Sequence, residues 1–169
     1  MEIWQPAYIG LGSNQDDPPA RIREAVERLF AVPRTRVVAV SPLFGSRPFG
    51  NVEQPDFVNA VAGVLTQLSP EALLAALKEL ERSMGRAAVH EKWGPRVIDL
   101  DLLVHGRERR ETSGLTLPHA GIVERNFVLY PLAAIAPDLD VPGLGRVARL
   151  RDRLADAGLW PLDTTTTTR

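Results

Sequence analysis

Apolar positions recur along this chain with two different periods, which predicts strands alternating with amphipathic helices. Runs rich in β-branched and aliphatic residues predict strands at 7–12, 35–40, 56–65 and 97–104. Apolar residues at helical spacing predict helices over 18–30, 70–84 and 127–135. The stretch 41–54 is rich in proline and glycine, and we interpret it as a long functional loop.

Both long helices carry end signals. The first begins near Asp17, and its apolar face would consist of Ile22, Val26, Leu29 and Phe30. The second has Ser69 as its N-cap, Pro70 at its first helical position and Gly85 as its C-cap. We assign its apolar face to the core: Leu73, Leu77, Leu80 and Met84.

The predicted order of elements is β-α-β-β-α-β with C-terminal additions. We therefore predict an α+β fold, a ferredoxin-like βαββαβ sandwich whose antiparallel sheet is covered by helices on one face. A doubly wound parallel sheet would need a helix between residues 35 and 65, where the pattern predicts none. We expect a single domain over 1–169, with the threonine-rich end, about 161–169, as a disordered tail.

Composition narrows the functional classes. The chain has 169 residues, of which 44% are hydrophobic and 24% charged, and this suits one globular domain with a substantial core. The formal net charge of −1 gives no general attraction for nucleic acid or an anionic membrane, so neither is an expected partner. The absence of cysteine excludes a disulfide framework, a thiolate zinc site and a thiol nucleophile.

The first six residues carry no targeting signal that we recognise. They lack the basic start and the long apolar run of a signal peptide, and no later run has transmembrane length. We therefore expect a soluble cytoplasmic protein.

A glycine-containing segment, 10–12, ends the first predicted strand. Gln15 stands where a dinucleotide-binding fingerprint needs its third glycine, and no phosphate-binding P-loop pattern occurs in the chain. Both common nucleotide-binding folds are therefore disfavoured. We interpret Gly12, Ser13 and Asn14 as a tight turn.

Two carboxylates interrupt the strand predicted at 97–104. Because successive side chains of a strand point to opposite faces, Asp99 and Asp101 should project side by side, with Cα atoms about 7 Å apart. Their face also carries Val97 and Leu103, and the opposite face carries Ile98, Leu100, Leu102 and Val104.

Two like charges on an apolar strand repel each other and lose hydration, so the pair needs a compensating cation, for which Mg²⁺ is the natural candidate. A D-x-D pattern is common by chance, and an arbitrary one is best interpreted as an exposed face paired with arginines. Here Trp93 and Arg96, just upstream, supply an aromatic plate and a phosphate-binding fork. The sequence therefore favours a metal-bound polyphosphate site.

The run K-W-G-P-R-V-I-D-L-D-L-L, residues 92–103, resembles the signature of the folate-pathway pyrophosphokinases that act on 6-hydroxymethyl-7,8-dihydropterin. The likeness extends over about 7–137 and includes the segments 8–14, 54–60, 115–119 and 125–127. It implies transfer of pyrophosphate from ATP, the co-substrate, to the hydroxymethyl group of the pterin, with release of AMP. It also implies two Mg²⁺ ions, and we expect a monomer.

The resemblance further implies residue roles. Asp99 and Asp101 would hold the Mg²⁺ ions, and Arg86 and Arg96 would be the catalytic arginines. The ATP-binding residues would be Leu74, Glu81, Lys92, Trp93, Arg96, Ile98, Thr116, His119 and Arg125. The pterin would lie between Phe57 and Phe127, with Asn59 at its polar edge and Ser46, Pro48 and Phe49 completing the pocket.

Several positions depart from the family pattern. Ala87, Ala88 and Val89 replace residues that are often basic, and Gly114 stands in place of a further arginine of the ATP site. Phe57 replaces a common tyrosine, and Ser46-Arg47-Pro48 replaces Thr-Pro-Pro. These changes bear on ATP affinity and loop closure more than on the type of reaction. Arg47 would compensate for part of the lost charge.

Two other function classes stay open at this point. In the first, the chain is a catalytically silent module that binds a nucleotide or pterin for regulation. Pure binding would not need Asp99 and Asp101, which argues against this class. Alternatively, it would be a metal-dependent nucleotidyl or phosphoryl transferase with another planar acceptor. Product analysis separates these classes, because AMP indicates pyrophosphoryl transfer and ADP indicates simple kinase chemistry.

Overall fold

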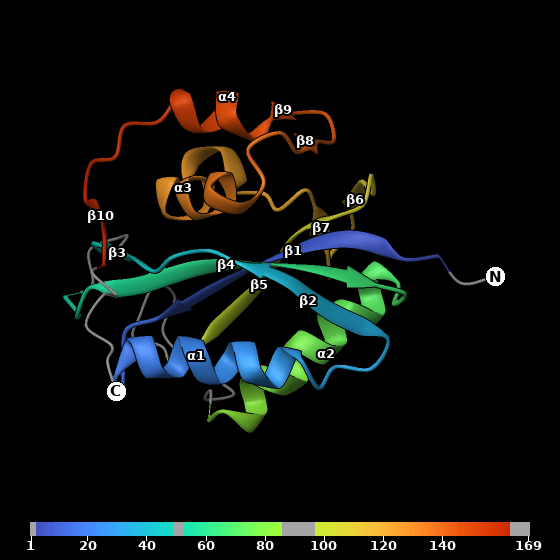
Figure 1. Ribbon diagram of the computed structural model, residues 1–169, viewed down its shortest axis with the longest axis horizontal. Coiled ribbons are helices and arrows are strands. Elements are labelled where there is room, and N and C mark those ends of the chain that lie inside the picture. Colours follow the sequence, from blue (N-terminus) through green and yellow to red (C-terminus); the bar gives the residue numbers. More distant parts are fainter. Residues whose placement is uncertain (1–2, 49–52, 86–96, 163–169) are drawn as a thin grey trace.

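The computed structural model describes residues 3–48, 53–85 and 97–162, and it places a sheet between two layers of helices (Figure 1). The sheet contains β1 (Gln5–Ser13), β2 (Thr35–Val40), β3 (Phe44–Ser46), β4 (Phe57–Thr66), β5 (Asp99–His105) and β10 (Leu159–Pro161). Helices α1 (Pro18–Leu29) and α2 (Pro70–Ser83) lie on one side of the sheet, and α3 (Asn126–Ile135) and α4 (Val147–Asp152) lie on the other.

Short elements connect the last third of the chain. These are the hairpin of β6 (Arg110–Glu111) with β7 (Thr116–Leu117), the turn η1 (Ile122–Glu124), and the hairpin of β8 (Asp140–Val141) with β9 (Gly145–Arg146). No helix among the described residues is long and apolar enough to cross a membrane.

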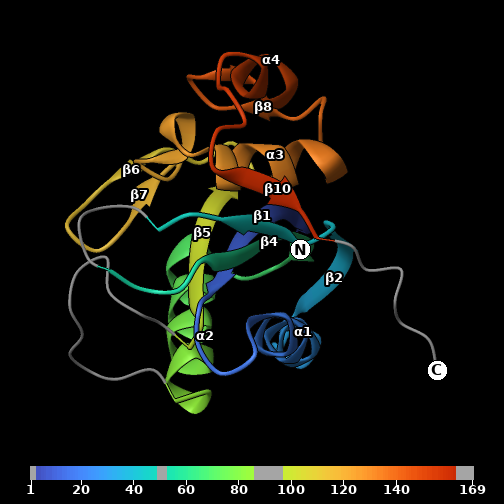
Figure 2. The same cartoon turned by 90° about the vertical axis from the view of Figure 1, so that its left-hand side faces the viewer.

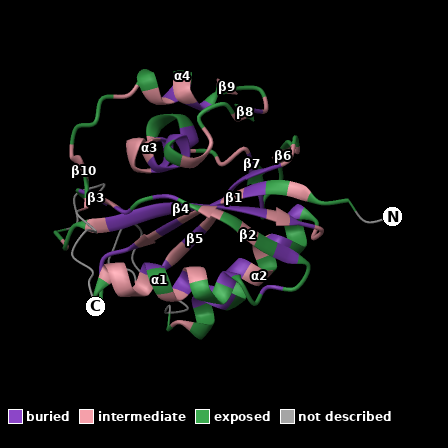
Figure 3. Ribbon diagram, viewed as in Figure 1, coloured by how far each residue is buried: buried purple, intermediate pink, exposed green. Residues whose placement is uncertain are grey.

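Strand β4 is the centre of the sheet. The order is β10-β3-β4-β1-β5, and β2 also pairs with β4, so that β2 lies along the end of β4 and β3 along its beginning. Every pairing among these strands is antiparallel, as predicted. Figure 3 shows β4 buried over most of its length, because helices cover both of its faces.

The sheet has a core on each face, which corrects the prediction of helices on one face only. Leu73 and Leu77 of α2 pack with Ile22 of α1 in the first core. In the second core, Leu129 and Leu132 of α3 are fully buried in one cluster that includes sheet residues. An all-round apolar helix such as α3 needs cover on several sides, and the sheet supplies one side while α4 packs on another.

A bulge in β5 corrects the predicted face of Val104. Tyr8 pairs with Val104 but the next residue, Ile9, pairs with Leu102, so Leu103 is an extra residue on β5. Leu103 and Val104 therefore both belong to the α3 core, whereas Leu102 remains in the α1–α2 core. The predicted alternation holds before the bulge, where the two aspartates lie.

Three further expectations need adjustment at element ends. Helix α1 ends at Leu29, so Phe30 is 63% exposed and Ala25 is buried on the predicted apolar face instead. Strand β3 lies inside the stretch interpreted as a loop. Pro161 belongs to β10, and two residues of the expected tail are therefore part of the fold; 163–169 lie outside the described residues.

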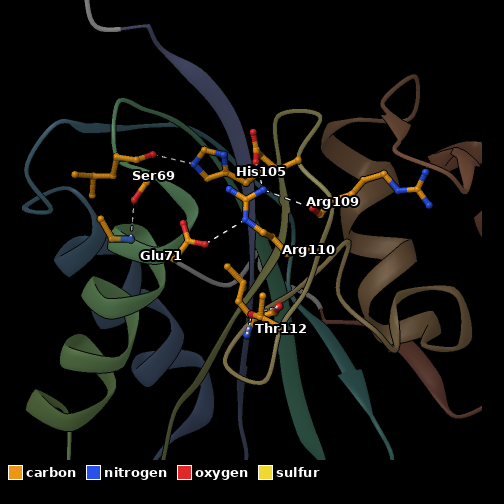
Figure 4. A network of polar contacts seen from close by, with 10 residues as sticks. Ser69, Glu71, His105, Arg109, Arg110 and Thr112 are labelled. Carbon is orange, nitrogen blue, oxygen red and sulfur yellow. Dashed lines mark hydrogen bonds and ion pairs between the residues drawn. The ribbon is translucent and has the colours of Figure 1, made fainter.

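Polar contacts join the start of α2 to the end of β5 and to the β6–β7 hairpin (Figure 4). The Ser69 hydroxyl accepts a hydrogen bond from the backbone amide three residues later, at 3.1 Å, which confirms the predicted N-cap. The His105 ring donates to the backbone carbonyl of Leu68 at 2.9 Å, and the Arg110 guanidinium bonds the Glu71 carboxylate at 3.2 Å. The hairpin is thereby held against α2.

We expect Ser69→Ala to lower the free energy of unfolding by about 1 kcal/mol, because the first turn of α2 loses its side-chain acceptor. Urea denaturation followed by circular dichroism measures this change. Ser113→Ala, at an exposed loop position, is the matched control and should stay close to the wild type. Equal loss in both variants would contradict the capping role.

Candidate active site

The two predicted metal-binding acids lie side by side at the beginning of β5. Asp99 and Asp101 are half-buried, and they alternate with Leu100 and Leu102, which are buried in the core. Burial raises the pKa of Asp101 to about 7, and the negative charge of Asp99 adds to this effect. Ionisation of Asp101 beside Asp99 is therefore unfavourable, and a bound cation would reduce this cost. Its carboxylate oxygens are the donors that Mg²⁺ prefers, so the site fits that ion.

Charges from two other segments act on Asp101. Arg125, just before α3, and Lys78, on α2, both lower the pKa of Asp101, whereas Glu81 raises it. Glu81 is only 2% exposed, and its carboxylate accepts the backbone N–H of Leu100 at 2.6 Å. One oxygen of Glu81 thus fixes the backbone between the two aspartates.

His119 is held beside the acid pair by its backbone and its ring. Its amide N–H donates to the Leu103 carbonyl of β5 at 2.9 Å, and Nδ1 accepts the amide N–H of Gly121 at 3.2 Å. Burial lowers the pKa of His119, and Arg125 lowers it further, while Asp99 opposes them. The ring is therefore neutral at pH 7. Because Nδ1 accepts a hydrogen bond, the proton of the neutral ring lies on Nε2.

Three of the predicted pterin-binding residues line a common cavity, whereas Phe57 and Asn59 are not among the residues that line it. Ser46, Pro48 and Phe127 line one cavity of about 230 Å³. Asn59 is 5% exposed, and its side-chain nitrogen donates to Ser46 Oγ at 2.8 Å and to the Phe44 carbonyl at 3.4 Å. The Arg125 guanidinium lies 5.9 Å from the centre of the Phe127 ring. Arg125 thus links the acid pair to the aromatic cavity.

Comparison with known proteins gives the family. The model of the family 7,8-dihydro-6-hydroxymethylpterin-pyrophosphokinase (HPPK) matches residues 8–137. The chain belongs to the HPPK family. The match covers both the acid pair and the aromatic cavity, apart from the C-terminal segment that lines one side of the cavity.

Individual relatives support this assignment. The chain is 46% identical to the 2-amino-4-hydroxy-6-hydroxymethyldihydropteridine pyrophosphokinase of Pseudomonas aeruginosa, over 82% of this chain and 85% of that protein. The enzyme of the same name from Haemophilus influenzae is 39% identical over 89% and 93% of the two chains. The folic acid synthesis protein fol1 of Schizosaccharomyces pombe is 42% identical over 80% of this chain but 18% of its own length.

A solved structure shares the fold. The chain superposes on wild-type Plasmodium falciparum HPPK-DHPS, solved with pteroate, with a TM-score of 0.73 over 90% of this chain. It covers 43% of that longer protein. The sequence identity is 14%, so this likeness concerns the fold alone.

Other predicted HPPK site residues occupy different environments. Thr116 and His119 line a separate cavity of about 450 Å³ together with Arg110 of the hairpin. Ile98 is 0% exposed, and Leu74 packs partly buried against the same core. The side chains of these last two residues are therefore packed largely within the protein. Phe49, Arg86, Lys92, Trp93 and Arg96 lie outside the described residues, as do Ala87, Ala88 and Val89.

Two asparagines position the site and were not singled out by the sequence analysis. Asn14, a residue of the expected tight turn, is buried. Its side-chain nitrogen donates to the Gln54 side chain at 2.8 Å and to the Pro55 carbonyl at 3.0 Å. It thus holds the chain that leads into Phe57. Asn126, next to Phe127, donates to two backbone carbonyls near the C-terminus. Only its place beside Phe127 could have drawn attention to it.

No group of three or more histidine, aspartate or glutamate side chains suited to a metal is found in the described part of the HPPK chain. The metal hypothesis therefore rests on the two aspartates of β5. Their position on a rigid strand, backed by Glu81, favours a fixed spacing of the carboxylates.

The raised pKa of Asp101 predicts how the stability of the metal-free HPPK chain depends on pH. A carboxyl group with a raised pKa in the folded state stabilises the fold at low pH, and this contribution is lost as the pH rises towards and past 7. In EDTA at pH 8, Asp101→Asn should therefore melt at a higher temperature than the wild type, by on the order of 5 °C. The difference should shrink at pH 5.

Scanning calorimetry at both pH values measures this effect. Asp138→Asn, an exposed substitution in the turn after α3, provides the control for the loss of one negative charge. Equal melting temperatures of Asp101→Asn and wild type at pH 8 would show that the acid pair carries no electrostatic cost.

Proposed function

We propose that the chain transfers pyrophosphate from ATP to 6-hydroxymethyl-7,8-dihydropterin, giving the pterin diphosphate and AMP in folate biosynthesis. The observation that carries this proposal is the junction at Arg125, which interacts electrostatically with Asp101 and His119 and lies over Phe127. A phosphate site and an aromatic site for a flat heterocycle therefore adjoin. Membership of the HPPK family supports the same reaction.

The reaction joins the hydroxymethyl oxygen to the β-phosphorus of ATP and breaks the bond from that phosphorus to the oxygen bridging to the α-phosphorus. The hydroxyl proton is released, and AMP leaves with the bridging oxygen. No protein nucleophile is required. Negative charge on the phosphate oxygens must be neutralised, so cations and hydrogen-bond donors should account for most of the catalysis.

Asp99 and Asp101 are the residues that we propose to hold Mg²⁺, with two ions expected. When bound, Mg²⁺ would neutralise and orient the phosphate oxygens. His119 would donate from Nε2 to a phosphate oxygen, which suits a neutral ring whose Nδ1 is already occupied. Arg125 would contribute a fixed positive charge. Lys92, Trp93 and Arg96 as ATP contacts, and Arg86 as an arginine that arrives on loop closure, remain predictions.

The pterin would stack between Phe57 and Phe127, since a flat heterocycle between two phenylalanine rings tolerates a dry pocket. Asn59 already donates from its nitrogen to Ser46 and Phe44. Its carbonyl oxygen is therefore the atom that would accept a hydrogen bond from the amino-substituted edge of the ring. A different heterocycle would leave buried polar atoms without hydrogen-bond partners, and this energetic cost would make the pocket specific for the pterin.

We also propose that the fold is ferredoxin-like. Strands β5, β1, β4 and β2 pair in that order, and α1 and α2 connect them as two βαβ units on one face. Strands β3 and β10, with α3 and α4, would be additions to this unit. The monomeric state and the cytoplasmic location remain predictions from the sequence.

The proposed function is tested by incubating the chain with ATP, 6-hydroxymethyl-7,8-dihydropterin and Mg²⁺ and separating the nucleotides by chromatography. We expect AMP and pterin diphosphate only when both the pterin and Mg²⁺ are present. Asp101→Asn should reduce kcat by at least about 100-fold, because a metal-binding carboxylate is lost. Asp138→Asn, at an exposed position in the turn after α3, should retain activity.

Other outcomes favour the alternative classes. ADP as the product would indicate simple kinase chemistry. Tight binding of pterin and ATP without turnover would indicate a silent binding module.

The departure at Gly114 yields a second prediction. A Cβ atom built at Gly114 meets no atom of the described residues within 4 Å, its two chain neighbours apart, so a longer side chain fits there without displacing them. Gly114→Arg should therefore lower the KM for ATP, about threefold to tenfold, through an added charge-assisted hydrogen bond. The KM for pterin should not change.

Steady-state kinetics with each substrate varied separately measure both constants. Gly114→Gln is the matched control, because it adds length without charge. The same KM for ATP in both variants would place residue 114 outside the ATP site.

A further inference from the structure

The C-terminal segment 154–162 closes one side of the cavity that contains Phe127. Leu154, Ala155, Ala157 and Gly158 line this cavity together with residues of the predicted pterin pocket. Figure 2 shows β10, in red, running beside α3 at the edge of the sheet. We call residues 154–162 the C-terminal strap.

The strap is bonded to β3 along its length. Leu159 pairs with Ser46 and Trp160 pairs with Gly45 in an antiparallel ladder. Beyond the two ends of this ladder, the Arg47 amide donates to the Gly158 carbonyl and the Leu162 amide donates to the Leu43 carbonyl, each at 3.0 Å. The strap therefore fixes the backbone that carries Ser46 on the side of β3 that faces away from β4.

The strap is also bonded to α3. The Asn126 side-chain nitrogen donates to the carbonyls of Ala155 and Ala157, both at 3.0 Å. One helical turn later, the Tyr130 hydroxyl donates to the Leu154 carbonyl at 2.9 Å. Two of these bonds come from the residue directly before Phe127, so they fix the start of the helix that carries the Phe127 ring.

A close contact sets how near the strap lies to β3. A Cβ atom built at Gly45 would overlap the indole ring of Trp160. Gly45 has no left-handed backbone angle that would itself demand glycine. Glycine at this position therefore allows the Trp160 ring to lie directly on the β3 backbone.

We propose that the C-terminal strap sets the separation of the two walls of the pterin cavity, with Asn126 and Trp160 as positioning residues. The β3 wall and the α3 wall come from distant parts of the chain, and the strap bonds to both. The inference rests on the proposed function for the identity of the ligand, a pterin. It adds that residues beyond the matched family region, 8–137, control the affinity for that ligand.

The test uses Asn126→Asp, which keeps the shape of the side chain but removes its donor. The Kd for 6-hydroxymethylpterin is measured by its fluorescence in the presence of Mg²⁺ and α,β-methylene-ATP. We expect the Kd and the KM for pterin to rise about tenfold, the scale of one or two lost hydrogen bonds, with kcat and the Kd for the nucleotide within about twofold.

Thr35→Val is the matched control for a general loss of stability. It removes the buried 2.7 Å hydrogen bond to Thr66 at the far end of β4, away from the cavity. If Thr35→Val and Asn126→Asp lower the melting temperature alike but only Asn126→Asp raises the pterin Kd, the strap has the proposed role. Equal effects on pterin and nucleotide in both variants would overturn it.

A mutant cycle tests the contact of Gly45 with Trp160. Gly45→Ala alone should raise the pterin Kd, because the new methyl group displaces the indole ring. In a Trp160→Ala background the same substitution should have little further effect. Additive effects of the two substitutions would contradict the steric argument.

Hydrogen exchange at the Arg47 amide separates this inference from the proposed function. This amide is bonded to Gly158, and it should exchange faster in Asn126→Asp while the Val61 amide, bonded to Ser41 Oγ, does not change. If the wild type forms no AMP and binds no pterin, the proposed function fails, yet faster exchange at Arg47 still supports the coupling of the walls. Unchanged exchange at Arg47 overturns the strap in either case.

Discussion

The central constraint on this protein is the placement of two carboxylates on a strand whose neighbouring residues are buried. Burial and mutual repulsion raise the pKa of Asp101 to about 7, so the folded chain holds a site that favours added positive charge. Arg125 and Lys78 supply part of that charge, and the neutral ring of His119 avoids adding more. These charges fit the proposed binding of a cation, and of the phosphates that a cation binds, at the beginning of β5.

Rigid backbone supports this costly arrangement. The buried carboxylate of Glu81 bonds the amide between the two aspartates, and β5 pairs with β1 along its length. The bulge at Leu103 then places the Val104 side chain in the second core without disturbing the acids. The unfavourable burial of two like charges is therefore confined to the beginning of β5, while two apolar cores stabilise the rest of the sheet.

The sequence predicted those parts of the fold that have a long regular pattern. Strands β1, β2, β4 and β5 and helices α1, α2 and α3 all have such patterns, and their order predicted an antiparallel sheet correctly. Strands β3 and β10 have three residues each, too few to show a period. Val104 lies on the face opposite to the predicted one because of a bulge opposite Tyr8. Such a bulge is a property of the strand pairing and cannot be recognised in either segment alone.

The candidate site likewise contains residues that the sequence could predict and residues that it could not. The acid pair came from alternation on one strand, and the aromatic and arginine residues came from a family resemblance that the family match confirms. Asn14 and Asn126 act through carbonyl groups remote in sequence, so no local pattern could reveal them.

The pairing of β10 with β3 has a consequence for folding. Strand β10 lies near the end of the described chain and β3 lies in its first third, so their contact closes a very long loop. Closing such a loop costs more chain entropy than forming the neighbouring hairpins, and distant contacts tend to form late. The cavity between the α3 wall, with Phe127, and the β3 wall, with Ser46, should accordingly be completed in the last stage of folding.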